Sequence, residues 1–267
     1  MKSFKTLVKV ILLLLISLCF FALRFAFWGV LFRFPVVDRK TKRWILRYWA
    51  RTFSFIIGMK RQTSGAVPAP PFLLVANHIT YFDMLVLACE TGCIFVSRED
   101  VEHWPVIGTF AKSLHMLFID RSKRRDALRV NRLISKALTE GDGIVIFPES
   151  RVSCGMAVEE FKSPLLQPAV DLQIPVHYAS ISYRTPPSSP VEGAIVSWWR
   201  PESFVAHLIR FLHYQGATAL IHFGESPIPG TDRKVLAQEL HAAVQAQFIP
   251  LRQAASTYNS SEFPVQP

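Results

Sequence analysis

The sequence predicts an α/β domain with a mixed, mostly buried sheet flanked by helices, preceded by N-terminal membrane helices. Three observations lead to this prediction. Short apolar runs alternate with helical segments from residue 72 onward, which is typical of α/β domains. An uncharged run covers residues 10–23, and the excess positive charge of the chain is confined to residues 1–61. The last two features are typical of a segment that meets a lipid surface.

Composition and charge exclude several classes of protein. Of the 267 residues, 50% are hydrophobic and 19% are charged, which excludes a disordered chain. Residues 1–61 hold 13 Lys or Arg and one acid, whereas the rest of the chain has a net charge of −2. A nucleic-acid partner is therefore not expected, because the body lacks a basic surface. The four cysteines form no CxxC pair, so neither a disulfide framework nor a metal site is expected.

The first predicted helix is an uncleaved membrane anchor. Lys2, Lys5 and Lys9 precede the apolar run 10–23, but no small-x-small cleavage signature follows it. Fourteen residues make a helix of about 21 Å, shorter than a hydrocarbon core of about 30 Å. Extension toward Pro35, where the helix is expected to end, places Arg24 inside the apolar segment. A single span and a two-helix interfacial hairpin therefore both remain open.

The second predicted helix begins near residue 39 and is amphipathic. Aromatic residues recur at helical spacing from Trp44 to Phe53, and Arg43, Arg47 and Arg51 follow another face. This pattern favours a helix at head-group depth, and the alternative is a surface helix packed on its own domain. The basic cluster favours the cytoplasmic side of an inner membrane for the body of the chain.

A breaker-rich linker at 62–71 separates residues 1–61 from a body that covers 72–250, and a flexible tail is expected at 251–267. The apolar runs of the body predict strands at 72–76, 94–97, 116–119, 143–147, 176–182, 194–198 and 219–223. Helices are predicted near 82–91, 104–114, 124–139, 164–172, 202–214 and 232–248.

The segment Asn-His-Ile-Thr-Tyr-Phe-Asp, residues 77–83, carries the clearest chemistry. His78 follows a buried strand, at the sheet edge where sites often form, and Asp83 opens the next helix. A turn between them can return the carboxylate to the imidazole, which would fix its tautomer and leave the other nitrogen as a general base. The alternative is a helix-capping Asp83 beside a packed loop histidine.

This segment resembles the NHxxxxD signature of the glycerolipid acyltransferases, the family of 1-acylglycerol-3-phosphate acyltransferase. Three further blocks resemble the family's in the same order, and the likeness covers roughly residues 70–250. They are Leu117-Phe118-Ile119-Asp120-Arg121, Val145-Ile146-Phe147-Pro148-Glu149-Ser150 and Ile174-Pro175-Val176. The residues of these blocks are similar to those of the bacterial branch that includes lyso-ornithine-lipid acyltransferases. The resemblance implies His78 and Asp83 as catalytic residues. It implies substrate binding by Asn77, Arg121, Phe147, Pro148, Glu149, Ser150, Arg151 and Pro175.

The third and fourth blocks depart from the family pattern. Ser150 replaces a glycine, Arg151 a common threonine and Val152 the usual arginine, and Tyr178 replaces a second proline. A side chain at 150 can crowd a loop that prefers glycine. These changes leave the His78–Asp83 pair intact but weaken the expectation of a phosphate-ester acceptor.

The resemblance implies a membrane-bound O-acyltransferase of lipid metabolism. It would move a fatty acyl group from acyl-CoA or acyl carrier protein to the hydroxyl of a lysolipid, either lysophosphatidic acid-like or lyso-ornithine lipid. The expected partners are membrane lipids and the acyl donor, with no cofactor or metal. Two alternatives stay open: a lipid-binding protein that keeps the fold without activity, and a lipid transacylase or hydrolase that uses the same His-Asp pair.

Overall fold

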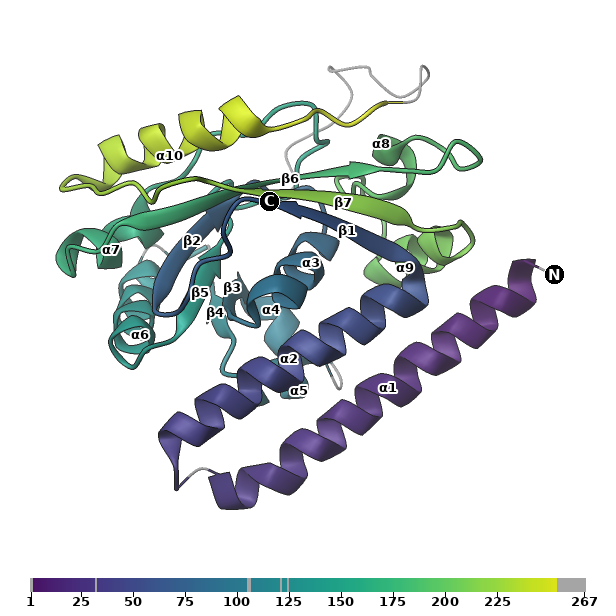
Figure 1. Ribbon diagram of the computed structural model, residues 1–267, viewed down its shortest axis with the longest axis horizontal. Coiled ribbons are helices and arrows are strands. Elements are labelled where there is room, and N and C mark those ends of the chain that lie inside the picture. Colours follow the sequence, from purple (N-terminus) through teal and green to yellow (C-terminus); the bar gives the residue numbers. More distant parts are fainter. Residues whose placement is uncertain (1, 32, 105–106, 121, 124, 254–267) are drawn as a thin grey trace.

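The computed structural model describes residues 2–31, 33–104, 107–120, 122–123 and 125–253. It confirms the α/β fold, with a seven-stranded sheet in the order β1-β7-β6-β2-β5-β3-β4 (Figure 1). The strands are β1 (Met59–Ser64), β2 (Phe72–Ala76), β3 (Ile94–Arg98), β4 (Leu117–Ile119), β5 (Gly143–Ile146), β6 (Val176–Arg184) and β7 (Ala217–Phe223).

The sheet is mixed, because β6 pairs with β7 antiparallel whereas the other paired strands are parallel. In the centre, β2 lies between β5 and β6, with Leu74 opposite both Val145 and His177. Parallel neighbours end at the same edge of a sheet. The residues that follow β2 and β5, beginning with Asn77 and Phe147, are therefore brought together at one edge.

Helices cover both faces of the sheet. Figure 1 shows α10 across one face, while α2 and α3 lie beneath the opposite face. The helices of the body are α3 (Phe82–Thr91), α4 (Glu99–Glu102), α5 (Ile107–Ser113), α6 (Asp126–Thr139), η1 (Pro164–Leu166), α7 (Gln167–Asp171), α8 (Glu192–Ile195), α9 (Phe204–Leu212) and α10 (Arg233–Gln247).

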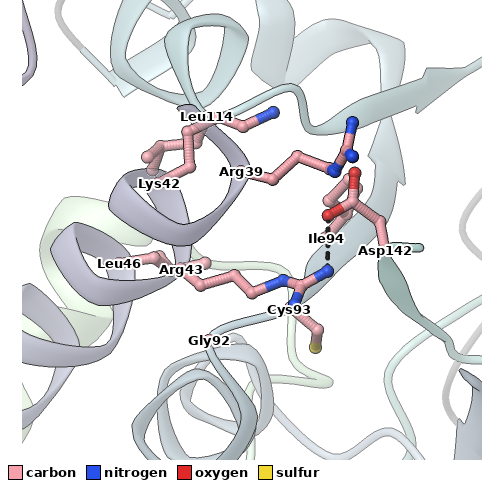
Figure 2. A pocket seen from close by; sticks show the side chains of 9 residues that line it. All are labelled: Arg39, Lys42, Arg43, Leu46, Gly92, Cys93, Ile94, Leu114 and Asp142. Atoms are coloured by element: carbon pink, nitrogen blue, oxygen red, sulfur yellow. Dashed lines mark hydrogen bonds and ion pairs between the residues drawn. The ribbon is translucent and has the colours of Figure 1, made fainter. Parts of the chain in front are cut away.

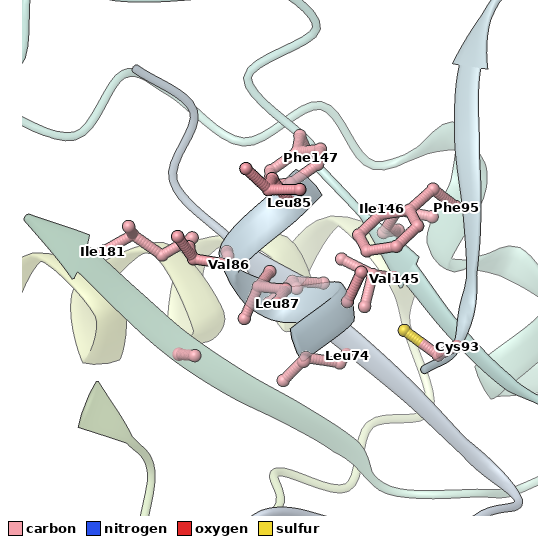
Figure 3. Close-up of a cluster of buried hydrophobic side chains, with 14 of the residues drawn as sticks. Leu74, Leu85, Val86, Leu87, Cys93, Phe95, Val145, Ile146, Phe147 and Ile181 are labelled. Atoms are coloured by element: carbon pink, nitrogen blue, oxygen red, sulfur yellow. The ribbon is translucent and has the colours of Figure 1, made fainter. Parts of the chain in front are cut away.

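The core lies between the sheet and these helices. Figure 3 shows part of it, where Leu87 of α3 packs among strand residues such as Leu74 and Val145. All five residues of β2 are buried. A strand that is apolar on both sides reads as a continuous hydrophobic run, which explains why the sequence predicts β2 correctly.

Two long helices precede the sheet: α1 (Lys2–Leu31) and α2 (Pro35–Ile57), which lie side by side (Figure 1). Pro35 occupies the first turn of α2, where its missing N–H has no helical partner to lose. Within the described residues, Ser3–Phe27 is the one segment long and apolar enough to cross a membrane, and only 11% of its most apolar stretch is buried.

Arg24 does not lie among the outward apolar side chains of α1. Its side chain is fully buried, with Nε donating to the Ser113 carbonyl at 2.9 Å and Nη1 donating to Asp38 Oδ1 at 2.7 Å. Lys42 Nζ lies 3.7 Å from the other oxygen of Asp38. The charge that interrupts the apolar run is thus compensated inside the protein, where pairing offsets the loss of hydration.

Helix α2 packs on the body along one face and is exposed along another. Arg43, Arg47 and Arg51 donate hydrogen bonds to the carbonyls of Gly141, Thr91 and Cys89, which fastens one face of α2 to the body. A Cβ at Gly92 would lie 2.6 Å from the Arg43 carbonyl, so this close approach requires glycine. Trp44 and Tyr48 remain exposed on another face.

Two boundaries and one element differ from the sequence-based expectations. Residues 59–64 form strand β1, so the expected linker at 62–71 begins only after Ser64. The predicted strand at 194–198 is wrong: Glu192–Ile195 form the short helix α8, and the apolar run reflects burial rather than an extended backbone. Leu251 is buried and Arg252 pairs with Glu192, so the chain is still attached to the body at the start of the expected tail.

Candidate active site

The His78–Asp83 pair is formed at the end of β2 and the start of α3. Asp83 Oδ2 accepts a hydrogen bond from His78 Nδ1 at 2.8 Å. The same oxygen accepts the backbone N–H groups of Ile79 at 2.6 Å and Thr80 at 2.9 Å. The carboxylate at the beginning of α3 therefore organises the preceding loop and orients the imidazole. Its backbone donors, Ile79 and Thr80, precede the helix, so Asp83 does not act as the helix cap that the alternative interpretation expected.

The second oxygen of Asp83 has its own donor. Tyr183, on β6, donates its hydroxyl to Asp83 Oδ1 at 2.7 Å. Asp83 is completely buried, and a buried carboxylate is tolerated only when such donors replace its hydration. Burial and contact with Asp83 raise the pKa of the Tyr183 phenol, so Tyr183 remains a donor across the working pH range.

His78 is held on three sides. Its Nδ1 is taken by Asp83, its backbone carbonyl accepts the N–H of Ser153 at 2.8 Å, and its ring stacks on Phe147 with centroids 4.2 Å apart. The side chain of His78 is 14% exposed. Because Nδ1 is occupied, Nε2 is the ring nitrogen available to take a proton.

Glu149 is buried against the loop that carries His78. Its Oε1 accepts the backbone N–H of His78 at 2.9 Å, and the residue is only 3% exposed. Oε2 has no hydrogen-bond partner in the described part of the chain. Burial, above all, raises the pKa of Glu149 to about 9, so the carboxyl group carries a proton at neutral pH.

The loop after Glu149 shows the consequence of the missing glycine. Ser150 has a φ of +63°, in the left-handed region that favours glycine. The next side chain, Arg151, points outward and forms a mostly exposed ion pair with Glu159 at 3.2 Å. Pro148 is buried, and its carbonyl accepts the N–H of Lys162 at 2.9 Å.

The remaining expected site residues lie in different surroundings. Asn77 is buried, and its amide pairs twice with the backbone of Ile181, at 2.7 and 2.9 Å, so it joins β2 to β6. Pro175 precedes β6 next to the residue that pairs with Leu73, and therefore lies toward the opposite end of β2 from His78. The structure does not bring Pro175 to the site. Arg121 lies outside the described residues.

Sequence reasoning missed three contacts that hold the loop between His78 and Asp83. Besides Tyr183, the hydroxyl of Tyr81 lies 2.9 Å from Nδ1 of the buried His207, and the backbone N–H of Trp198 donates to the Ile79 carbonyl at 3.1 Å. The only signal in the sequence was the location of Tyr81 inside the His78–Asp83 segment. No spacing rule connects that segment to residues more than 100 positions away.

The pocket in Figure 2 is not part of this site. Arg39, Lys42 and Arg43 of α2 line it together with Ile94, the first residue of β3, and Asp142, which precedes β5. It therefore lies at the edge of the sheet where the parallel strands begin, whereas His78 lies at the edge where they end. Within the described residues, no three His, Cys, Asp or Glu side chains gather as metal ligands.

The chain is similar to several known proteins. Residues 59–182 match the Acyltransferase family. The chain is 30% identical over 213 residues to a lyso-ornithine lipid O-acyltransferase from Pseudomonas aeruginosa, a match that covers 79% of each chain. It is 31% identical over 120 residues to a 1-acyl-sn-glycerol-3-phosphate acyltransferase from Neisseria gonorrhoeae, covering 43% of this chain and 47% of that one.

A solved structure shares the fold. The crystal structure of the 1-acyl-sn-glycerophosphate (LPA) acyltransferase, PlsC, from Thermotoga maritima superimposes with a TM-score of 0.58 at 17% identity. The match covers 89% of this chain and 95% of that chain. Together with the identity shared with the Pseudomonas aeruginosa relative over most of both chains, these matches show that the chain belongs to the acyltransferase family.

Proposed function

We propose that this acyltransferase moves a fatty acyl group from a thioester donor, acyl-CoA or acyl carrier protein, to the hydroxyl of a lysolipid. The observation that carries the proposal is the His78–Asp83 pair, in which a fully buried carboxylate with donors on both oxygens orients a partly exposed imidazole. An imidazole fixed in this way through Nδ1 is suited to act as a general base through Nε2.

The reaction needs one base and no covalent enzyme intermediate. His78 Nε2 takes the proton of the lysolipid hydroxyl while the hydroxyl oxygen attacks the carbonyl carbon of the thioester. The tetrahedral intermediate then collapses, the carbon–sulfur bond breaks, and the departing thiolate takes the proton back from His78. Asp83 stabilises the imidazolium that forms between these two proton transfers.

Lyso-ornithine lipid is the favoured acceptor. The relatives named for that activity match over most of both chains, whereas the Neisseria relative named for 1-acyl-sn-glycerol-3-phosphate matches over less than half of each. Two features of the site fit an acceptor without a terminal phosphate: Glu149 binds the His78 backbone, and Arg151 is paired with Glu159 on the surface. We assign Arg121 to the acceptor site on the likeness of its block alone.

We also propose that α1 anchors the protein in the inner membrane, with the catalytic body on the cytoplasmic side. The uncovered apolar surface of Ser3–Phe27 supports insertion. The burial of Arg24 against Asp38 removes the main obstacle to it, because that charge is then not presented to hydrocarbon. The lysolipid acceptor resides in the bilayer, which makes such an anchor useful.

The decisive experiment is acyl transfer by membranes that contain the full chain. Labelled acyl-CoA and acyl carrier protein are each offered with lyso-ornithine lipid and with lysophosphatidic acid, using wild type, His78→Ala, Asp83→Asn and a matched control, His222→Ala. His222 is exposed on β7. We expect transfer by wild type and His222→Ala and its loss in the other two.

Other outcomes identify the alternatives. Release of free fatty acid without lipid product would show a hydrolase. Equal transfer by wild type and His78→Ala would overturn the role of His78. The absence of product from folded wild type with every donor and acceptor would favour a lipid-binding protein that keeps the fold.

A further inference from the structure

Helix α9, Phe204–Leu212, has two different faces. Its inner face is buried and includes His207, Phe211 and Leu212. Its outer face is apolar, with Val205 59% exposed and Ile209 42% exposed, and Ala206 lies exposed beside them. An apolar face on a short helix that is otherwise well packed indicates a contact with another apolar phase.

No charged side chain of α9 interrupts the outer face. The one charged residue of the helix, Arg210, donates to the Ala194 carbonyl and to Glu202 Oε1, so its guanidinium is directed along the body. The ring of Phe204, at the start of α9, contacts the rings of Trp104 and Trp198 with centroids 5.4 and 6.3 Å apart. Aromatic residues of this kind gather where a protein meets the membrane interface.

The last turn of α9 is attached to α1. Lys9 Nζ lies 3.4 Å from the Leu212 carbonyl and 3.5 Å from the Tyr214 carbonyl, at the negative end of the α9 helix dipole. The neighbouring positions on α1 carry large exposed apolar side chains, including Leu7, Val8 and Leu12. The outer face of α9 therefore belongs to a helix that contacts α1, which carries exposed apolar side chains of its own.

The inner face of α9 reaches the catalytic loop. His207 lies 2.9 Å from the hydroxyl of Tyr81 through Nδ1 and 3.3 Å from the Ser197 carbonyl through Nε2. Burial lowers the pKa of His207 to about 4, so the ring is neutral and can accept from Tyr81 while donating to Ser197. Tyr81 belongs to the segment between His78 and Asp83, and one helix thus joins the apolar surface to the loop.

We propose that α9 is a further membrane-contacting element: its Val205–Ile209 face lies in the apolar surface of the bilayer beside α1 and holds the His78 loop at the level where a lysolipid enters. The inference rests on the proposed anchoring of α1 in the membrane. The occupant of this face is lipid and not a protein, because α9 contacts the apolar helix α1 and the one charged side chain of α9, Arg210, is already paired with the body.

The first test places a probe on each helix of the full chain in vesicles of phosphatidylethanolamine and phosphatidylglycerol. In a Cys19→Ser, Cys154→Ser background, an environment-sensitive fluorophore is attached to Leu14→Cys on α1, Ile209→Cys on α9 or Val235→Cys on α10. Val235 is a matched control, because it is 52% exposed and lies on α10, across the opposite face of the sheet from α2 (Figure 1).

We expect lipids with a spin label on the acyl chain to quench the probes at 14 and 209 and to spare the probe at 235. Quenching at 14 with none at 209 would overturn the proposal while leaving α1 in the membrane. A change at 209 that follows protein density in the vesicle, without lipid quenching, would indicate a second copy on this face and would also overturn it.

The second test separates delivery from chemistry. Val205→Glu with Ile209→Glu should lower kcat/KM for a long-chain lysolipid in vesicles by about tenfold or more, because two apolar contacts with lipid are lost. Transfer to a short-chain lysolipid dissolved as monomers should be unchanged, and Val235→Glu should change neither. An equal loss with both acceptors would show damage to the loop and contradict the proposal. If wild type transfers nothing, the proposed reaction fails, but the quenching result still decides the position of α9.

Discussion

The carboxyl group of Glu149 accepts a hydrogen bond from the backbone amide of His78, with 2.9 Å between nitrogen and Oε1. The resemblance implied substrate binding for Glu149, yet the observed contact is with the backbone of the His78 loop. Because burial keeps the carboxyl protonated at neutral pH, this contact is between a neutral acid and a peptide group. Two predictions separate this role from that of a charged ligand for the acceptor.

Glu149→Gln should retain most of the transfer activity, because the amide oxygen of Gln can accept from the His78 N–H in place of the neutral acid. Glu149→Ala should lower kcat by about 10- to 100-fold, the effect expected when a buried donor loses its acceptor. Steady-state kinetics with both substrates varied measure this difference. A Gln variant as impaired as the Ala variant would show that the carboxyl group itself takes part.

The same residue should make stability depend on pH. In the unfolded chain Glu149 ionises near its ordinary pKa of 4.5, whereas the folded protein keeps the proton up to a pKa of about 9. Between these values the folded state holds more protons, so the contribution of Glu149 to stability falls as pH rises. Glu149→Gln removes this dependence. The melting temperature of the variant relative to wild type should therefore rise from pH 5 to pH 8.5, and a constant difference would contradict the assignment.

Tyr183→Phe should slow the reaction without weakening substrate binding. The change removes the only side-chain donor to Asp83 Oδ1 among the described residues and leaves the shape of the core almost unchanged. Loss of a hydrogen bond to a charged group should lower kcat by about tenfold or more, with little change in KM. Tyr178→Phe, a half-buried tyrosine on the same strand, is the matched control and should behave as wild type. A rise in KM with unchanged kcat would point instead to a role in binding.

The buried charges that join α1 to α2 should be sensitive to the removal of one partner. Asp38→Ala leaves Arg24 buried without its carboxylate, which should destabilise the protein by about 3 kcal/mol. Arg24→Met combined with Asp38→Ala removes both charges and should recover part of that loss. Thermal unfolding in detergent compares the two variants. Equal destabilisation by both would show that the shape of the side chains matters more than their charge.

The strand that the sequence missed and the one that it misplaced have different physical causes. β1, Met-Lys-Arg-Gln-Thr-Ser, is a polar edge strand that pairs only with β7, so it carries no apolar pattern to find. The run at 194–198 is apolar because it is buried, and burial alone does not distinguish a strand from a short helix and loop. The central strands β2 and β5 were found because both of their faces are buried.

The sequence by itself was enough for the α/β class, the apolar N-terminal helix and the His78–Asp83 pair, because each depends on residues close together in the chain. Periodicity and a five-residue spacing carry that information locally. The partners of the pair depended on tertiary structure: Tyr183 reaches Asp83 across 100 residues, and Glu149 reaches the His78 amide across 71. The environment of Arg24 also depended on tertiary structure. The sequence places its charge in an apolar run, whereas the fold buries it against Asp38. Such contacts follow from the register of parallel strands and the packing of distant helices, which no local pattern encodes.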